Sequence, residues 1–293
     1  MNSPTVSTKL IILLGNPLGH SVSPAMHNRV FEKLALDYCY LPVQVSAENL
    51  KTVFTALTRM NVAGFNVTIP HKVAIIEHLD SLDPLAATIG AVNTICVEGG
   101  KTRGYNTDGE GFIRALEKEG NIGVQNKKIF LLGSGGAARA IAMTLAFRGA
   151  DRIFIANRTP AKALALAAEV NEKIAPCAVA VEMEPSALRQ TIAACDIFVN
   201  STSLGMHPHQ EESAIAEEFL FSHLVVADIV YNPHKTRLLA MAESKGCRIV
   251  HGIGMLIEQG AAGFKLWTGI EPLVDEMMEI ATAAVVGRKE SAR

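Results

Sequence analysis

The chain has few of the residues that mark specialised classes of protein. Its five cysteines are spread over 293 residues without a C-x-x-C pair, and aromatic residues make up only 5% of the sequence. An odd, scattered set of cysteines argues against a disulfide framework and suits a reducing compartment. A net charge of −2 provides neither the basic surface that nucleic acids require nor a polybasic membrane patch. We therefore expect small-molecule partners and no nucleic acid.

Long hydrophobic runs are also lacking. No apolar run approaches the roughly 20 residues that span a bilayer, and the first nine residues lack the basic-then-apolar pattern of a secretory signal. We predict a cytoplasmic protein that makes no use of a membrane. A hydrophobic content of 49% with 19% charged residues is typical of a globular protein, and 293 residues are enough for two domains.

A glycine-rich turn follows a short hydrophobic run near the middle of the chain. Residues 129–132 predict a buried strand and residues 137–148 a helix, joined by Gly133, Ser134, Gly135 and Gly136. Between a strand and a helix, G-x-G-x-x-A is typical of a dinucleotide-binding turn, where free N–H groups and the helix dipole attract a pyrophosphate. Here Gly133 permits the turn, Gly135 the approach of the ligand, and Ala138 close packing. A glycine turn without a ligand is the alternative.

A second anchor follows the next predicted strand, residues 152–156. That strand ends at Asn157, Arg158 and Thr159, with Lys162 one helical turn later. An acidic residue at this place would bind the ribose 2′-hydroxyl of NAD and repel a 2′-phosphate. Two cations and a neutral hydrogen-bonding pair instead favour NADP(H) as the cofactor.

Strand-like and helix-like segments alternate through most of the sequence, which predicts an α/β fold with mainly parallel sheets. Ser23 and Ser46 are the predicted N-caps of two helices, and residues 120–126 are the predicted linker between two domains. Residues 91–97 and 101–105 resemble a hairpin around Glu98, Gly99 and Gly100. The other predicted strands are 10–14, 38–45, 64–69, 178–182, 196–200 and 224–230, and the predicted helices are 23–34, 47–60, 109–119, 255–267 and 272–286.

Polar residues gather at strand ends and turns of the first half, where α/β proteins place ligands. Ser21 and Ser23 lie at a helix start and could bind a carboxylate, although Ser23 could equally be only a helix cap. Lys72 follows Pro70 and could be an ordinary surface cation, while Asp108 lies in a later turn. If the two met, they would form a proton donor and acceptor for an alcohol.

The histidines suggest a metal site only weakly. His207, His209, Glu211 and Glu212 lie in a polar loop without the helical H-x-x-x-H spacing of a metal-binding pair. We predict no metal.

The ordered set of motifs resembles the shikimate dehydrogenase family over nearly the whole chain. The motifs are residues 15–17, 20–24, 27–28, 64–72, 90–94, 104–108, 133–137, 157–159, 200–206, 228–233 and 252–259. The resemblance implies two domains, an N-terminal α/β substrate domain with a mixed, mainly parallel sheet and a Rossmann-like NADP-binding domain, with a cleft between them. The expected boundaries are 1–110 for the substrate domain, with helices in 253–293 packing back on it, and 111–252 for the NADP-binding domain.

The resemblance also implies an activity, the reversible NADP-linked reduction of 3-dehydroshikimate to shikimate in aromatic biosynthesis. Lys72 and Asp108 match the family's catalytic pair. The residues that match substrate-binding positions are Ser21, Ser23, Thr68, Asn93, Asp108, Tyr231 and Gln259. Those that match cofactor-binding positions are Gly133, Ser134, Gly135, Gly136, Ala137, Asn157, Arg158, Thr159, Lys162, Ile229 and Gly252.

Several alternatives stay open in the sequence. Lys162 stands where NADP-specific members commonly have arginine, so cofactor preference could be less strict. Quinate differs from shikimate by one ring hydroxyl, and the serine motif fits both. A quinate/shikimate dehydrogenase that uses NAD or both cofactors, and a non-catalytic NADP- or metabolite-binding module, are the competing functions. Lys72 is the favoured proton donor and Asp108 the alternative. A monomer and a homodimer are both compatible with the sequence.

Overall fold

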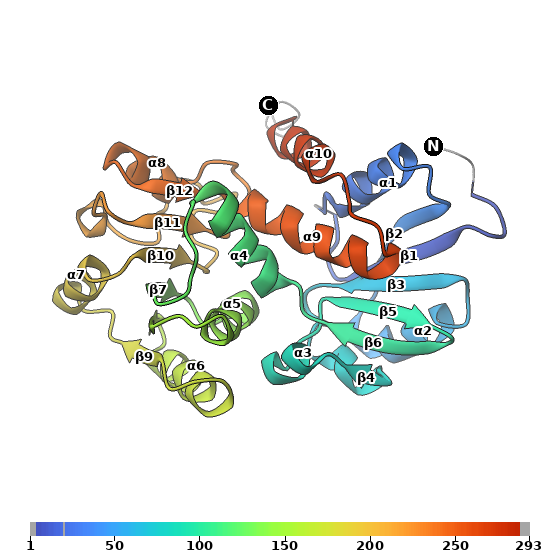
Figure 1. Ribbon diagram of the computed structural model, residues 1–293, viewed down its shortest axis with the longest axis horizontal. Coiled ribbons are helices and arrows are strands. Elements are labelled where there is room, and N and C mark those ends of the chain that lie inside the picture. The colour runs from blue at the N-terminus through green and yellow to red at the C-terminus, as the bar shows by residue number, and fades with distance from the viewer. Residues whose placement is uncertain (1–3, 20, 288–293) are drawn as a thin grey trace. The chain divides into compact units, whose positions relative to one another are not determined.

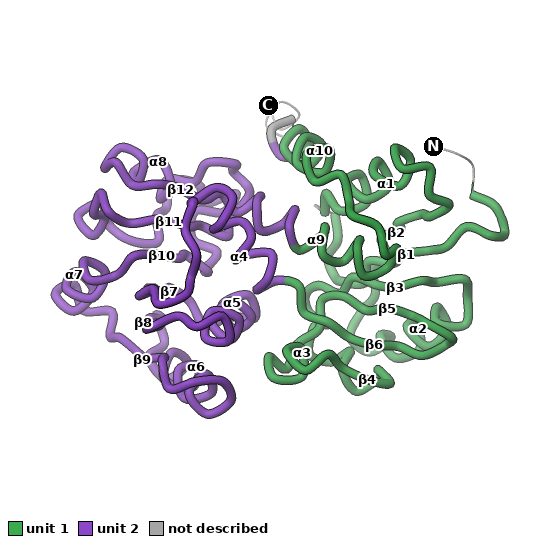
Figure 2. The backbone as a smooth tube through the Cα atoms, in the orientation of Figure 1, with its two compact units in different colours: residues 1–107, 259–284 green, residues 108–258, 285–293 purple. Residues whose placement is uncertain are grey.

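The computed structural model describes residues 4–19 and 21–287. Contacts between Cα atoms divide the chain into two compact units, which Figure 2 shows in separate colours. Unit 1 comprises Met1–Thr107 and Gln259–Ala284, and unit 2 comprises Asp108–Glu258 and Val285–Arg293. His20 of the serine motif and residues 288–293 of the expected C-terminal segment lie outside the described residues. Among the described residues, no helix is both long and apolar enough to cross a membrane.

Unit 1 contains a mixed sheet with helices on its faces (Figure 1). Its helices are α1 (Ser23–Lys33), α2 (Leu50–Leu57), α3 (Pro84–Ile89), the part of α9 (Gly252–Thr268) from Gln259 onward, and α10 (Val274–Gly287) up to Ala284, with 3-10 turns η1 (Ala47–Asn49) and η2 (Ala74–His78). Its strands are β1 (Lys9–Gly15), β2 (Tyr38–Gln44), β3 (Val62–Val67), β4 (Ser81–Leu82), β5 (Thr94–Glu98) and β6 (Lys101–Tyr105).

The six strands of unit 1 are ordered β2-β1-β3-β5-β6-β4. Strand β1 pairs in parallel with β2 and β3, whereas β5 is antiparallel to β3 and β6. The predicted hairpin is confirmed, because Glu98 pairs with Lys101 across Gly99 and Gly100, which have φ values of +56° and +76°. Those positive φ angles suit a two-residue hairpin turn, which glycine adopts without strain.

Strand β1 of unit 1 is a continuous buried run from Ile11 to Leu14, so its hydrophobic side chains cover both faces of the sheet. On one face, Ile12, Leu14 and Phe65 join a cluster with Leu50 and Phe54 of α2. The other face receives a group of ring-bearing side chains: His27 and Phe31 from α1, Tyr40 from β2, and Phe264 and Trp267 from α9. The second half of α9 therefore packs on this face within unit 1.

Trp267 determines how closely the second half of α9 approaches the sheet. Its indole Nε1 donates to the Ile95 carbonyl oxygen over 3.0 Å. A Cβ atom added to Gly64 would overlap Trp267 Cδ1, so glycine is required there for the helix to approach. Burial of a Trp side chain of this kind is worth about 3–5 kcal/mol relative to Ala.

Unit 2 contains a fully parallel sheet, with the strand order β12-β11-β10-β7-β8-β9. This is the 3-2-1-4-5-6 order of a dinucleotide-binding fold, read from the opposite edge. The strands are β7 (Lys128–Leu132), β8 (Arg152–Ala156), β9 (Ala178–Val181), β10 (Ile197–Asn200), β11 (Val225–Asp228) and β12 (Arg248–Val250). The helices are α4 (Asp108–Glu119), α5 (Gly136–Phe147), α6 (Pro160–Lys173), α7 (Pro185–Ala193), α8 (Arg237–Ser244) and the start of α9, with the 3-10 turn η3 (Glu217–Phe219).

Three local predictions were wrong. Val22 rather than Ser23 is the N-cap of α1, and the predicted helix 47–60 is split into η1 and the shorter α2. Ser46 precedes η1 without a side-chain capping bond, and its Oγ instead accepts from Asn49 Nδ2. Residues 120–126, which we interpreted as a linker, lie inside unit 2, because helix α4 before them packs against α5 and β12. The polar, glycine-containing composition of residues 120–126 is typical of a linker. That composition does not show whether the helix before it already packs in the second unit.

His27 is a fully buried histidine whose two ring nitrogens have no hydrogen-bond partner among the described residues. Its ring stacks on Tyr40 at a centroid distance of 4.7 Å. Burial among aromatic rings disfavours the imidazolium and lowers the pKa of His27 to about 3.

This burial predicts a loss of stability in acid. In the unfolded chain the imidazole takes up a proton below pH 6.5, whereas in the folded chain it does so only near pH 3. Between these values His27 should lower the free energy of unfolding by about 1.4 kcal/mol per pH unit as the pH falls. Urea unfolding of the wild type and His27→Phe at pH 7, 6 and 5 measures the difference.

The variant His27→Phe keeps a stacked ring and removes the titration, so its stability should fall less steeply. His209→Asn changes an exposed histidine and should follow the wild type. Parallel pH dependence of the wild type and His27→Phe would contradict this role of His27.

Candidate functional site

The glycine turn of unit 2 lies between β7 and α5, as predicted. Gly133 has φ +117°, and a Cβ atom there would lie 2.6 Å from Ser201 Oγ. Gly135 is the N-cap of α5, which has no side-chain cap and no acidic residue in its first turn. A Cβ atom on Gly135 or Gly136 would meet nothing within 4 Å. The helix start therefore offers N–H groups and open space to an anion.

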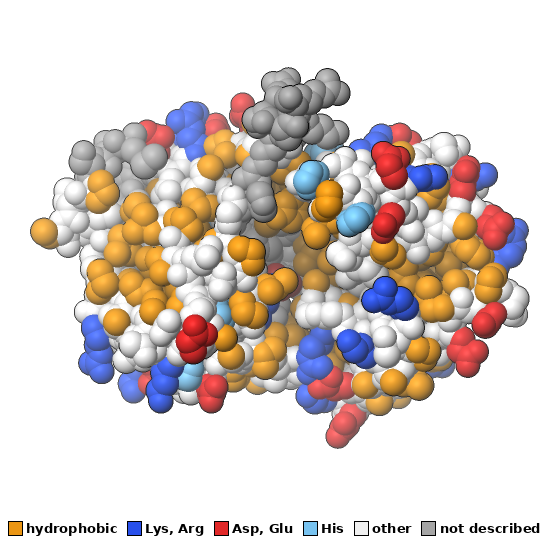
Figure 3. All heavy atoms as spheres, turned by 180° about the vertical axis from the view of Figure 1, so that it is seen from behind, with side chains coloured by type: hydrophobic (Ala, Val, Ile, Leu, Met, Phe, Trp, Pro, Cys, Tyr) orange, Lys and Arg blue, Asp and Glu red, His pale blue; other side chains and the backbone are white. Residues whose placement is uncertain are grey.

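The second anchor follows β8. Asn157 is partly buried and its Nδ2 donates to the Thr159 carbonyl oxygen over 3.0 Å, which shapes the turn before α6. Arg158 and Lys162 are exposed, with Lys162 in the first turn of α6. These cations remain available to an anionic group. Over the face in Figure 3, Lys and Arg side chains are interspersed with Asp and Glu.

A buried carboxylate organises the loops after β10 and β11. Asp228 accepts hydrogen bonds from Asn200 Nδ2 at 2.9 Å, Thr236 Oγ1 at 2.6 Å and the Val230 N–H at 3.1 Å. Burial raises the pKa of Asp228 to about 6, although these three donors oppose the shift. The network holds the turn that carries Ile229 and Tyr231.

Ile229 and Gly252 come together in unit 2. A Cβ atom on Gly252 would lie 2.6 Å from the Ile229 carbonyl carbon, so the two backbones are in close contact. Both residues follow strands at the same edge of the parallel sheet, β11 and β12 respectively. The carboxyl ends of the strands are where such sheets bind ligands.

Ser21 and Ser23 lie at the start of α1 in unit 1. Ser21 Oγ accepts from the Ser23 N–H over 3.3 Å, and Ser23 is buried. Val22 occupies the N-cap of α1, so Ser23 is the first residue of the helix and not its cap.

Asn93 and Gln259 meet in unit 1 although 166 positions separate them. Asn93 Nδ2 donates to Gln259 Oε1 over 3.3 Å and to Thr107 Oγ1 over 3.0 Å. Asn93 Oδ1 accepts from the Thr107 N–H over 2.9 Å. Asn66 joins the same group, because its Nδ2 donates to the Asn93 carbonyl oxygen over 3.0 Å.

Thr68 and Lys72 flank a turn beside this network. The Thr68 carbonyl oxygen accepts from the His71 N–H over 2.8 Å, and the Lys72 carbonyl oxygen accepts from the Val92 N–H over 2.8 Å. Lys72 is thereby held beside the residue that precedes Asn93, and it is partly exposed. Asp108 is buried as the first residue of α4. Lys72 belongs to unit 1 and Asp108 to unit 2, so their pairing stays a prediction.

Sequence reasoning placed Asn66 and Thr107 in polar clusters but did not include them, or Tyr40, among the expected site residues, although all three belong to the unit 1 network. The sequence does offer a reason to select Asn66, because it is a polar residue on the same strand face as Gly64 in an otherwise apolar run. The sequence offers no such reason for Tyr40, because an aromatic residue in a strand resembles any other core residue.

The described residues contain no group of three or more His, Cys, Asp or Glu side chains that could hold a metal ion. His209 and Glu212 of the loop lie 3.7 Å apart, from Nδ1 to Oε1.

Comparisons with known proteins agree with this architecture. Three family models match the chain: the shikimate dehydrogenase substrate binding domain over residues 13–95, shikimate / quinate 5-dehydrogenase over residues 115–231, and the shikimate 5′-dehydrogenase C-terminal domain over residues 252–281. The shikimate dehydrogenase (NADP(+)) of Methanopyrus kandleri is 44% identical over 278 residues, which cover 94% of this chain and 96% of that protein.

Solved structures give the same result. Shikimate 5-dehydrogenase from Listeria monocytogenes, in complex with shikimate and NAD, superposes with a TM-score of 0.91 at 41% identity and covers 96% of this chain and 99% of its own. Quinate dehydrogenase from Corynebacterium glutamicum, in complex with NAD, superposes with a TM-score of 0.87 at 32% identity and covers 94% of this chain and 99% of its own. With 44% identity to a curated member across nearly its whole length, the chain belongs to the shikimate dehydrogenase family.

Proposed function

We propose that the chain catalyses the reversible NADP-linked reduction of 3-dehydroshikimate to shikimate, through the residues described above. The observation that carries the proposal is the joining of Asn93 and Gln259 in one hydrogen-bond network of a chain that also has a dinucleotide-type turn. Membership of a family with NADP-dependent shikimate dehydrogenases supports the choice of substrate and cofactor.

The residues of unit 2 fit NADP(H). The first-turn N–H groups of α5 suit the pyrophosphate, and Gly135 and Gly136 leave space for it. Arg158 and Lys162 would pair with the 2′-phosphate, assisted by Asn157 and Thr159. Ile229 and Gly252 would lie beside the nicotinamide. When bound, NADPH supplies the hydride that the carbonyl carbon accepts.

The residues of unit 1 bind the substrate in this proposal. Ser21 and Ser23 donate to its carboxylate, while Thr68, Asn93 and Gln259 hold its ring hydroxyls. Lys72 donates a proton to the oxygen that becomes the alcohol, and its positive charge stabilises the alkoxide that develops there. Asp108 orients Lys72 and the substrate, and Tyr231 completes the pocket.

We also propose that the protein works in the cytoplasm. All five cysteines are free, and four of them are buried. Unpaired thiols are typical of a reducing compartment.

The activity is tested by assaying the purified chain with shikimate or quinate, each with NADP⁺ or NAD⁺. We expect the highest kcat/KM for shikimate with NADP⁺, because two cations follow β8 where NAD-specific folds have an acidic residue. A preference for quinate and NAD⁺ would favour the quinate dehydrogenase alternative. Binding without turnover in all four combinations would show a non-catalytic module.

Lys72→Ala should lower kcat by about 10²- to 10⁴-fold, because it removes the proton donor. Steady-state kinetics with shikimate and NADP⁺ measure the change, and the KM for NADP⁺ should stay at the wild-type value. Lys51→Ala, an exposed lysine of α2, is the matched control and should be fully active.

Asp108→Asn separates the two proton-transfer assignments. If Lys72 is the donor, Asp108→Asn should keep a pH–rate profile with a titrating group, and Lys72→Ala should lose it. Near-normal turnover of Lys72→Ala would show that the assignment of Lys72 is wrong.

Substitutions at two glycines distinguish an effect on cofactor binding from an effect on folding. Gly135→Ala should keep the wild-type melting temperature and raise the KM for NADP⁺ at least about tenfold, because its Cβ atom would point into space intended for the pyrophosphate. Gly133→Ala should lower both stability and cofactor affinity, since its φ of +117° and the Ser201 contact exclude a side chain. Gly123→Ala, at an open position, is the control. Wild-type NADP⁺ affinity in Gly135→Ala would place the cofactor elsewhere.

A further inference from the structure

Asp228 lies where three segments of unit 2 meet, at the carboxyl edge of the parallel sheet. It is the last residue of β11, and it pairs across the sheet with Asn200, the last residue of β10. Its Oδ1 atom accepts from Asn200 Nδ2 and from the Val230 N–H, while its Oδ2 atom accepts from Thr236 Oγ1. The two oxygens therefore hold different segments. Oδ1 holds the turn after β11 to β10, and Oδ2 holds the first turn of α8.

The partners of Asp228 all need an acceptor at this place. Asn200 Oδ1 already accepts from the N–H and the hydroxyl of Thr202, at 3.1 and 2.7 Å, so the amide presents its Nδ2 to Asp228. Thr236 is the N-cap of α8, and its Oγ1 accepts from the Leu239 N–H, which leaves the hydroxyl hydrogen for Asp228. The third partner is a backbone N–H, which can only donate. A carboxylate suits all three because it only accepts.

The bond to the Val230 N–H shapes the turn that carries Ile229. A side chain that accepts from the N–H two residues later forms an Asx turn, which constrains the backbone between them. The Ile229 N–H also donates to the Asn200 carbonyl oxygen over 3.0 Å. On the side of β12, a Cβ atom on Gly252 would lie 2.5 Å from the Val230 carbonyl oxygen. The turn is therefore held on both sides, with Val230 buried and Ile229 partly exposed.

The loop after β10 connects Asp228 to the glycine turn. Ser201 Oγ donates to the carbonyl oxygen at the end of β7 over 2.6 Å, and Ser201 lies against Gly133. Asn200, the residue before Ser201, donates to Asp228. The glycine turn and the turn that carries Ile229 are thus joined through two consecutive residues of one loop.

We infer that Asp228 is a positioning residue for hydride transfer, because its Oδ1 atom holds Ile229 at the edge of the sheet where the nicotinamide would lie. This inference rests on the proposed function, which assigns Ile229 and Gly252 to the nicotinamide. The same proposal assigns the phosphate groups to the start of α5 and the residues after β8. Loss of Asp228 Oδ1 should therefore slow the reaction of the bound cofactor and leave the affinity for NADP⁺ unchanged.

The test is Asp228→Ala in stopped-flow experiments with shikimate and NADP⁺ at about pH 8, where the wild-type carboxylate is charged. The rate constant for NADPH formation in the first turnover should fall about 10- to 100-fold, because a displacement of about 1 Å can cost that much. The slower phase should show a primary isotope effect with shikimate deuterated at the reacting carbon. The KM for NADP⁺ should stay within about twofold of the wild-type value.

Two substitutions in the same network separate the roles of Oδ1 and Oδ2. Asp228→Asn keeps an acceptor for Asn200 and Val230 and loses the one for Thr236, so it should restore most of the wild-type rate constant. Thr236→Val removes the bond to Oδ2 and the cap of α8. It should lower the melting temperature and keep the wild-type rate constant.

Asn200→Ala provides a second test of the turn if Asp228→Ala does not fold. It removes one donor to Oδ1 and leaves the Val230 N–H in place. The rate constant for NADPH formation should fall in the same direction as in Asp228→Ala but less, by about three- to tenfold, the effect of one lost hydrogen bond.

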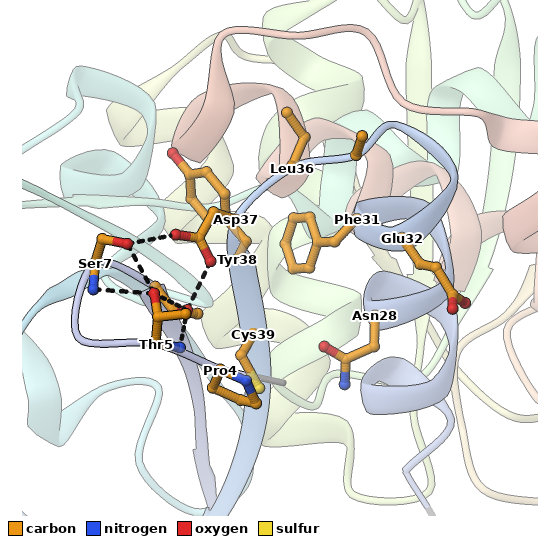
Figure 4. Close-up of a pocket in the computed structure, with 12 residues that line it drawn as sticks. Pro4, Thr5, Ser7, Asn28, Phe31, Glu32, Leu36, Asp37, Tyr38 and Cys39 are labelled. Carbon is orange, nitrogen blue, oxygen red and sulfur yellow. Dashed lines mark hydrogen bonds between the residues drawn. The ribbon is translucent and has the colours of Figure 1, made fainter. Parts of the chain in front are cut away.

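Asp37→Ala is the matched control in unit 1. This exposed carboxylate also holds a turn, because it accepts from Ser7 Oγ at 2.9 Å (Figure 4) and from Thr8 Oγ1 at 2.6 Å. It lines a hollow with Phe31 and Tyr38, and the proposed function assigns none of these residues to substrate or cofactor. Asp37→Ala should keep the wild-type rate constant for NADPH formation.

Each outcome has a distinct meaning. A wild-type rate constant in Asp228→Ala, or in Asn200→Ala if the first variant does not fold, overturns the inference and leaves the proposed function intact. A smaller amplitude with a wild-type rate constant shows loss of folded protein and also overturns it. So does a slow phase without an isotope effect, or an equal loss in Asp228→Asn. Absence of shikimate turnover by the wild-type chain overturns the proposed function and the inference with it.

Discussion

The contact between Trp267 and the sheet of unit 1 is the constraint on which the network of Asn93 and Gln259 depends. The indole lies against Gly64 and donates to the Ile95 carbonyl oxygen, which fixes the height of the second half of α9 above the strands. That height brings Gln259, which lies earlier on the helix, to Asn93. A larger residue at position 64 would push the helix away, and the network would lose its distal member.

Unit 2 is governed by a different constraint, the tight turn at Gly133. Gly133 has a positive φ and lies against Ser201, so the turn from β7 to α5 has no space for a side chain at that position. Gly135 and Gly136 instead face open space. Backbone strain and packing thus require glycine at position 133. At positions 135 and 136 we expect the requirement for glycine to come from the bound ligand. Asp228 has a comparable effect at the end of β11, because its three hydrogen bonds fix the loop that continues to Tyr231.

Much of the fold could be predicted from local pattern. The glycine turn and the hairpin at Gly99 and Gly100 follow from residues with special backbone preferences, and the buried strands of both sheets follow from short continuous apolar runs. Ser23 was predicted wrongly as a cap, because a serine before a proline is typical of helix starts in general. In the structure Val22 occupies the N-cap, and Ser23 is a buried first residue of the helix.

The sequence by itself determined the class of fold, the cofactor-type turn and the family, because these depend on motifs whose residues are neighbours along the chain. Only the tertiary structure decided that Gln259 meets Asn93, that Asn66 is held by Tyr40, and that Ile229 contacts Gly252. The register of the strands and the distance of a helix from the sheet determine which of these residues come into contact. Both arise from the packing of side chains that are distant in sequence, and spacing along the chain carries no record of that packing.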